Sequence, residues 1–121
     1  MSQPFESIPL TPTDPEDRKI ITLARAARGR TGADQGACVR DGDGRTYAAT
    51  SIGLRSLSLS AIQLAVAMAV SSSAPGLEAV ALVAENDPTD LELALVREVA
   101  GRSVTVWVID PNGVARDRIE A

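Results

Sequence analysis

The alternation of apolar and polar positions predicts a helix and then a hairpin in the first half of the chain. A helical stripe starts after Asp14, where a capping side chain and a first-turn proline stand together. It ends at Gly29 or Gly32, because glycine commonly closes helices. Two short apolar runs, 36–40 and 46–50, flank a turn made only of aspartate and glycine. This spacing predicts an antiparallel pair of strands rather than a calcium-binding loop.

In the second half of the chain, the same pattern predicts two more helices and three more strands. The second helix is apolar almost all the way round, which is typical of a helix buried in a core or an interface. It is shorter than the roughly 20 residues that a bilayer span needs. In chain order, the helix, strand, helix, strand and edge strand cover 57–70, 79–84, 91–99, 104–109 and 114–119.

This order of elements predicts one α/β domain with three layers and a mixed five-stranded sheet. The strand–helix–strand sequence in the middle of the chain implies parallel neighbours, whereas the hairpin implies antiparallel ones. We expect the domain to cover residues 14–121 and residues 1–13 to form a flexible N-terminal arm. The arm contains prolines and isolated apolar residues, and it would be ordered only if it docks.

Composition excludes several kinds of chemistry. The formal net charge is -4 and the arginines are scattered, so there is no electrostatic reason to expect nucleic acid or a membrane surface as a partner. The chain has no histidine and one cysteine, Cys38, which excludes a Ser-His-Asp triad, a Cys/His zinc site and an internal disulfide. Without an export segment, the cytoplasm is the expected compartment. Cys38 lies in an apolar strand and is expected to be a core residue.

Two helix starts carry a resemblance to a known family. Ser60-Ala61-Ile62 opens the second helix and Pro88-Thr89-Asp90-Leu91-Glu92 opens the third. The chain resembles the cytidine deaminases, in which these places read C-A-E and P-C-G-A-C after a "VGAAL" strand and a "DG" turn. The resemblance covers about Lys19 to Val114. It implies a three-layer α/β/α cytidine deaminase-like fold.

The same resemblance implies that the chemical positions of the family have been emptied. Ser60, Thr89 and Glu92 stand where the zinc ligands would be, and Ile62 stands where the catalytic glutamate would be. A hydroxyl is a poor zinc donor and an isoleucine cannot move a proton, so we expect no metal, no cofactor and no catalytic residue. The sugar-binding asparagine and glutamate of the family are likewise replaced, by Ser51 and Gly53.

Each candidate residue also has a simpler structural explanation. Ser60, Thr89 and Glu92 could surround a hard cation, but capping of helix ends is favoured. Capping also accounts for Asp87 and Asp90, next to Glu85 and Asn86 in an acidic cluster. A lone arginine, Arg55, precedes the second helix and could meet an anion there, although exposure to solvent is the commoner outcome. 

The sequence therefore favours a non-catalytic cytidine deaminase-like protein that acts as an oligomeric interaction or structural module. The apolar second helix and the resemblance imply a homodimer or homotetramer, with an unidentified protein as a further partner class. The alternative is a protein that binds a nucleoside or another small ligand in the remodelled pocket. An enzyme with a different mechanism ranks third.

Overall fold

The computed structural model describes residues 10–121, and the predicted N-terminal arm therefore falls mostly outside the described residues. The elements follow the predicted order, with two additional short strands between the hairpin and the second helix. They are α1 (Pro15–Thr31), β1 (Gly36–Asp41), β2 (Thr46–Thr50), β3 (Ile52–Gly53), β4 (Ser58–Leu59), α2 (Ala61–Ser71), β5 (Leu77–Val83), α3 (Asp90–Ala100), β6 (Thr105–Ile109) and β7 (Ala115–Glu120).

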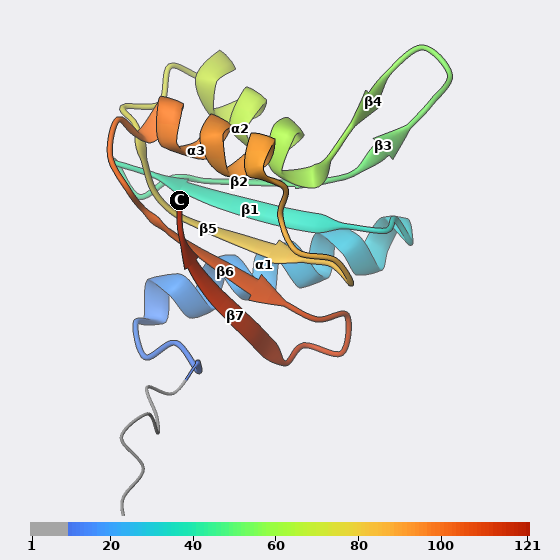
Figure 1. Ribbon diagram of the computed structural model, residues 1–121, viewed down its shortest axis with the longest axis horizontal. Coiled ribbons are helices and arrows are strands. Elements are labelled where there is room, and N and C mark those ends of the chain that lie inside the picture. The colour runs from blue at the N-terminus through green and yellow to red at the C-terminus, as the bar shows by residue number, and fades with distance from the viewer. Residues whose placement is uncertain (1–9) are drawn as a thin grey trace, which may run out of the picture.

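The main sheet has five strands in the order β2-β1-β5-β6-β7. Strands β5 and β6 are parallel, and the other neighbouring pairs are antiparallel. Helix α1 covers one face of the sheet, and α2 and α3 cover the other (Figure 1). The predicted mixed, three-layer α/β architecture is therefore confirmed.

Helix α1 begins and ends at the residues whose chemistry predicts a cap. The Asp14 side chain accepts a hydrogen bond from the Glu16 backbone N–H at 2.9 Å, which satisfies one free donor of the first turn. Gly32 closes the helix with a φ of 68°, in the left-handed region that favours glycine. The buried side of α1 presents Ile20 and Ala24 to a core cluster that includes Trp107 of β6.

The opposite face of the sheet carries the larger core, beneath α2 and α3. Ile62 and Val66 of α2 are buried against Val80, Leu82 and other apolar side chains of the central strands. Each buried aliphatic side chain of this kind stabilises the fold by roughly 1.5–3 kcal/mol relative to exposure. No helix among residues 10–121 combines the length and apolar character that crossing a bilayer requires.

The prediction of one helix over 57–70 is wrong at its beginning. Residues 58–59 form β4, which pairs antiparallel with β3, and α2 starts only at Ala61. Serine and leucine alternate from Ser56 to Ser60, and this period of two is typical of a strand. Together β3 and β4 make a hairpin that projects from the body of the domain (Figure 1).

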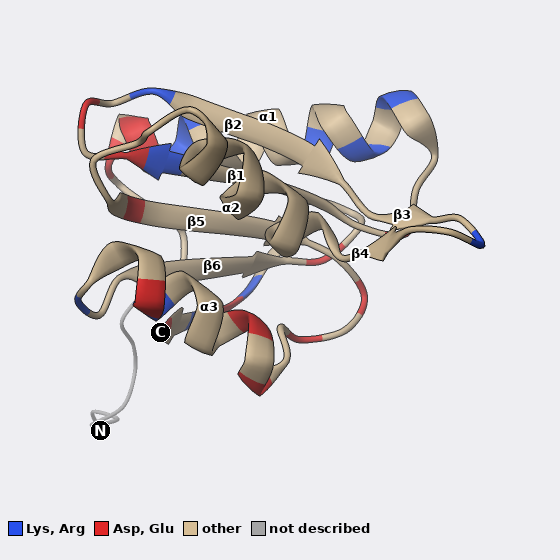
Figure 2. Ribbon diagram, turned by 90° about the horizontal axis from the view of Figure 1, so that it is seen from above, with Lys and Arg blue, Asp and Glu red and all other residues tan. Residues whose placement is uncertain are grey.

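Helix α2 is also not buried on every side within one chain. Its sheet-facing side is buried, whereas Met68 is 37% exposed and Val70 is 55% exposed. No charged residue lies on this helix, so the exposed side is apolar or neutral along its length (Figure 2). An apolar exposed helix face is one of the surfaces through which proteins associate.

The turn between β1 and β2 is organised by a buried carboxylate. Asp41 is fully buried and accepts hydrogen bonds from the backbone N–H groups of Asp43 and Arg45, both at 2.9 Å, and from the Tyr47 hydroxyl at 2.7 Å. Burial alone would raise the pKa of this carboxyl, but these hydrogen bonds together hold the pKa below its ordinary value. The aspartate–glycine segment is therefore a hairpin turn, as predicted.

Candidate functional site

The start of α2 is built around Ser60. The Ser60 side chain accepts from the Gln63 backbone N–H at 3.1 Å, and the Gln63 side chain accepts from the Ser60 backbone N–H at 2.9 Å. This reciprocal pair is a capping box, which satisfies two donors that a helix end leaves free. The Gln35 side chain accepts from the next backbone N–H, that of Ala61, at 3.1 Å. The Ser60 hydroxyl therefore serves the helix end, as the capping interpretation expects.

The start of α3 repeats the same arrangement. The Thr89 hydroxyl accepts from the Glu92 backbone N–H at 3.1 Å, and the Glu92 carboxylate accepts from the Thr89 backbone N–H at 2.8 Å. Glu92 is 5% exposed, so its charge is held at the helix end rather than in solvent. A carboxylate there is stabilised by the positive end of the helix dipole.

Ile62 lies in the hydrophobic core and is completely buried. It belongs to the cluster formed by α2, α3 and the central strands, so its side chain is surrounded by hydrocarbon. A carboxylate at this position would lose its hydration without gaining a partner from these neighbours.

These four residues do not form a metal site that fits zinc. Their polar oxygens are engaged in helix caps, and the remaining side chain is an aliphatic one in the core. A catalytic zinc ion needs three nitrogen, thiolate or carboxylate ligands around one point, with a water as the fourth. Within residues 10–121, no three carboxylate, cysteine or histidine side chains are grouped so that they could hold a metal ion.

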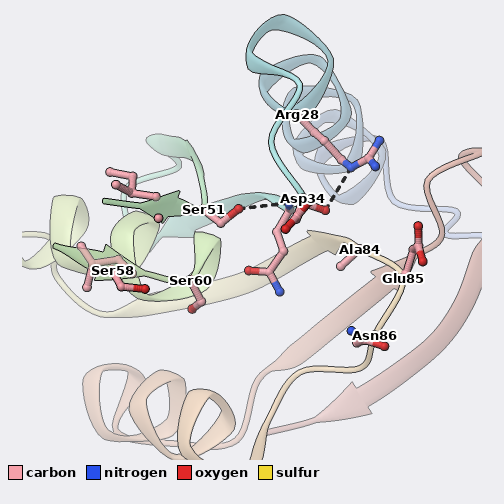
Figure 3. Close-up of a pocket in the computed structure, with 12 residues that line it drawn as sticks. Arg28, Asp34, Ser51, Ser58, Ser60, Ala84, Glu85 and Asn86 are labelled. Carbon is pink, nitrogen blue, oxygen red and sulfur yellow. Dashed lines mark hydrogen bonds between the residues drawn. The ribbon is translucent and has the colours of Figure 1, made fainter. Parts of the chain in front are cut away.

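A pocket of about 600 Å³ lies beside the start of α2. It contains Ser60 together with Ser51 and Gly53, the places where the resemblance puts the sugar-binding residues, whereas Ile62, Thr89 and Glu92 do not line it. Its other lining side chains come from the end of α1, the loop before β1, the β3–β4 hairpin and the end of β5 (Figure 3). They are Arg28, Asp34, Gln35, Ile52, Ser58, Leu59, Ala84, Glu85 and Asn86.

The pocket wall is held in place by contacts between α1 and the following loop. Arg28 Nε donates to the backbone oxygen of Asp34 at 3.1 Å, and the Gln35 backbone N–H donates to the Ser51 hydroxyl at 3.2 Å (Figure 3). The helix can approach β1 this closely because Gly36 has no side chain, since an added Cβ would lie 2.8 Å from the Arg28 Cβ. Most side chains of the wall are polar: they supply hydroxyls, two amides, two carboxylates and one guanidinium.

The residues of the acidic cluster predicted near the pocket make different contacts in the structure. Glu85 and Asn86 line the pocket, whereas Asp87 pairs with Arg116 of β7 at 2.7 Å. The prediction that Asp87 and Asp90 cap α3 is wrong, because Thr89 is the N-cap residue and Asp90 is the first residue of the helix. Thr89 is the N-cap because its backbone is extended and its hydroxyl accepts a hydrogen bond from the backbone N–H of Glu92, the third residue of the helix.

The remaining candidate residues lie outside the pocket. Cys38 is buried in β1, and burial raises the pKa of its thiol to about 11. It is therefore held in the unreactive protonated form at neutral pH, as expected for a core residue. Arg55 is exposed and lies in the loop that joins β3 to β4. Strand β4 therefore separates it in the sequence from the start of α2, at Ala61.

Sequence reasoning missed the contribution of α1 and of the loop that follows it to the pocket. Arg28 carries the signal of a cation at the C-terminal end of a helix, which complements the helix dipole and gives no indication of a pocket. Gln35 gives no local signal, because its partner Ala61 lies 26 residues away in the chain. Only the packing of α1 on β1 brings these side chains to the start of α2.

Comparison with solved structures finds the same fold in bacterial cytidine deaminases. The cytidine deaminase of Burkholderia pseudomallei superposes with a TM-score of 0.71 at 19% identity, over 85% of this chain and 91% of that one. The Mycobacterium leprae enzyme gives 0.67 at 18% identity, over 88% and 94%. The Mycobacterium tuberculosis enzyme gives 0.65 at 22% identity, over 85% and 90%.

Sequence comparison reaches the same family. No curated protein sequence matches the chain. The family model described as cytidine deaminase-like matches residues 13–113, which is most of the chain. On this match and on its fold, the chain belongs to the cytidine deaminase-like family.

Proposed function

We propose that this chain is a non-catalytic member of its family that works as a self-associating interaction or structural module. The observation that carries the proposal is the use of Ser60, Thr89 and Glu92 in helix capping boxes, with Ile62 in the core beside them. A zinc-activated water needs metal ligands and a proton-transferring carboxylate at these places. The side chains present supply helix stability instead.

The exposed side of α2 supports the second part of the proposal. Ala67, Met68 and Val70 are exposed on a helix without charge, and Leu54 and Leu57 are 64% and 46% exposed on the neighbouring hairpin. With a net charge of -4, two copies of the chain repel one another least where their surfaces are uncharged. A closed symmetric assembly would cover these side chains.

The proposal is tested by two measurements on the purified wild-type chain. Light scattering should report at least twice the chain mass of 12.6 kDa at micromolar concentration. Added zinc should leave the melting temperature unchanged, because a ligand that binds only the native state raises apparent stability by RT ln(1 + [L]/Kd). A monomeric mass at every concentration would contradict self-association, and a zinc-dependent rise in melting temperature would contradict the loss of the metal site.

A second candidate function is the binding of a nucleoside or another small polar ligand. The pocket of about 600 Å³ favours it, because this volume lies within the range of ordinary small-molecule sites. Its polar wall would suit hydroxyl and amide groups better than an apolar ligand. Cytidine, uridine and deoxycytidine, each tested at millimolar concentration, should raise the melting temperature if this function is correct. No shift with any of them would exclude these nucleosides.

A further inference from the structure

Strand β2 leaves one edge of the main sheet open. It is the terminal strand in the order, and among residues 10–121 no other strand pairs with its outer side. The Asp41 backbone N–H donates to the Arg45 oxygen, and this bond fixes which residues of β2 face β1. In an antiparallel pair the hydrogen-bonded positions alternate. The N–H and C=O groups of Thr46, Ala48 and Thr50 therefore point away from β1, toward the open edge.

The two edges of the sheet differ in how they are protected. Natural proteins prevent pairing at an open edge with charged side chains, prolines or bulges. Strand β7 at the other edge follows this rule, since it contains Arg116, Arg118 and Glu120 and has a bulge beside Ile109. Strand β2 reads Thr-Tyr-Ala-Ala-Thr, with no charge and no proline, and its pairing with β1 is regular. This edge is therefore open to a further strand.

We propose that the edge of β2 pairs with β2 of a second copy of the chain, antiparallel and centred on Ala48. The inference rests on the self-association proposed above and identifies its surface. In this register Ala48 lies opposite Ala48 of the second copy, and Thr46 lies opposite Thr50. These are the residues whose backbone groups point outward, so each outward N–H meets an outward C=O. If the second strand were shifted by one residue, the outward-pointing N–H and C=O groups of one copy would lie opposite residues of the other copy whose backbone groups point inward, toward β1.

The side chains of β2 fit those of a second β2 strand that runs in the opposite direction. Tyr47 would lie opposite Ala49 of the second copy, on the face covered by α2, so that a large side chain meets a small one. The two threonines would lie opposite one another on the other face, where paired hydroxyl side chains stabilise neighbouring strands. This near-palindromic order favours a second copy of the chain over an unrelated strand as the occupant.

Helix α2 extends the same surface above the sheet. It packs against β2 on one face, as Figure 2 shows, and it carries no charge. A two-fold axis perpendicular to the sheet would bring the α2 helices of both copies to the same face. The two helices, with Met68 and Val70 exposed on each, would then lie on the same face of the joined sheet.

A pair of charge variants tests the register. The double variant Thr46→Glu, Thr50→Glu would place like charges opposite one another at both ends of the joint, whereas Thr46→Glu, Thr50→Lys would place opposite charges there. Within one chain these two positions lie four residues apart on one strand, so the two variants differ little as monomers. We expect the first variant to have half the mass of the wild-type dimer by light scattering, and the second to recover the dimer mass.

Hydrogen exchange supplies an independent measurement on the unmodified chain. The Ala48 amide should exchange at least about tenfold more slowly at a concentration that favours dimer than at one that favours monomer. A wild-type dimer that persists in both charge variants, or an Ala48 amide that exchanges freely in the dimer, would overturn the β2 joint and leave self-association through another face. Loss of the dimer in both charge variants would overturn the register. A wild-type monomer would overturn this inference and the proposed module together.

Discussion

Thr89 and Glu92 each accept a hydrogen bond from the other's backbone N–H, at distances of 3.1 and 2.8 Å. Ser60 and Gln63 form the same reciprocal pair at the start of α2. The spacing of three residues that would let two thiolates reach one metal ion is also the spacing of a capping box. Where the family's motif has two thiolates, this chain thus has a hydroxyl and a carboxylate, and in the structure they stabilise the start of the helix.

This exchange predicts a measurable contribution of the α3 cap to stability. Thr89→Ala should lower the free energy of unfolding by about 1 kcal/mol, since it removes an N-cap side chain. Glu92→Gln should preserve most of the stability, because glutamine also completes a capping box. Urea unfolding measures both effects. An unchanged midpoint for Thr89→Ala would show that the cap does not hold the helix end.

Position 62 is predicted to tolerate apolar but not acidic side chains. Ile62→Glu should lower the free energy of unfolding by about 3 kcal/mol or more, because apolar burial is lost and an unpaired polar group enters the core. The matched variant Ile62→Val should lose only about 0.5–1.5 kcal/mol. Chemical denaturation at pH 7 measures the difference. If both variants unfold at the same midpoint, the side chain at position 62 reaches solvent and the burial argument is wrong.

The Cys38 thiol is predicted to be inert in the native protein. Burial raises its pKa to about 11, so the nucleophilic thiolate is scarce at neutral pH. Labelling with a disulfide reagent at pH 8 should be at least about 100-fold slower in the native chain than in urea. Rapid native labelling with an apparent pKa below 9 would mean that the thiol is exposed and activated.

The buried turn carboxylate predicts a loss of stability in acid. The hydrogen bonds to Asp41 lower its pKa in the folded chain from the ordinary value of 3.8, although burial acts in the opposite direction. A lowered folded pKa contributes stability that is present above the unfolded value and is lost as the pH falls through the folded one. Asp41→Asn should therefore reduce the change in melting temperature between pH 5 and pH 2.

The exposed turn residue provides the control for this pH dependence. Asp43→Asn removes a charge from the same turn without touching the carboxylate that accepts the hydrogen bonds. Its melting temperature should follow the wild-type curve from pH 5 to pH 2. Equal behaviour of both variants would assign the acid sensitivity to the charge of the turn in general.

Local chemistry accounts for the parts of the fold that the sequence predicts. Asp14 and Gly32 bound α1 because capping requires only neighbouring backbone groups. The β3–β4 hairpin is not predicted because Leu57 and Leu59 are followed almost directly by the apolar residues of α2. The strand period of two and the helix period therefore cannot be separated near Ser60. The pocket contributions of Arg28 and Gln35 depend on tertiary packing, which has no signature in their local sequence.

The central claim is most directly tested by one assay of ammonia release from cytidine and deoxycytidine, run on protein whose zinc content is measured by elemental analysis. The variant Ser60→Cys, Ile62→Glu, Thr89→Cys, Glu92→Cys serves as the comparison, because it restores the family's ligand and acid–base side chains. We predict that the wild-type chain contains far less than one zinc per chain and releases no ammonia above background. This prediction for the wild-type chain does not depend on whether the restored variant is active. About one tightly bound zinc per wild-type chain, with ammonia released from cytidine, would contradict the account.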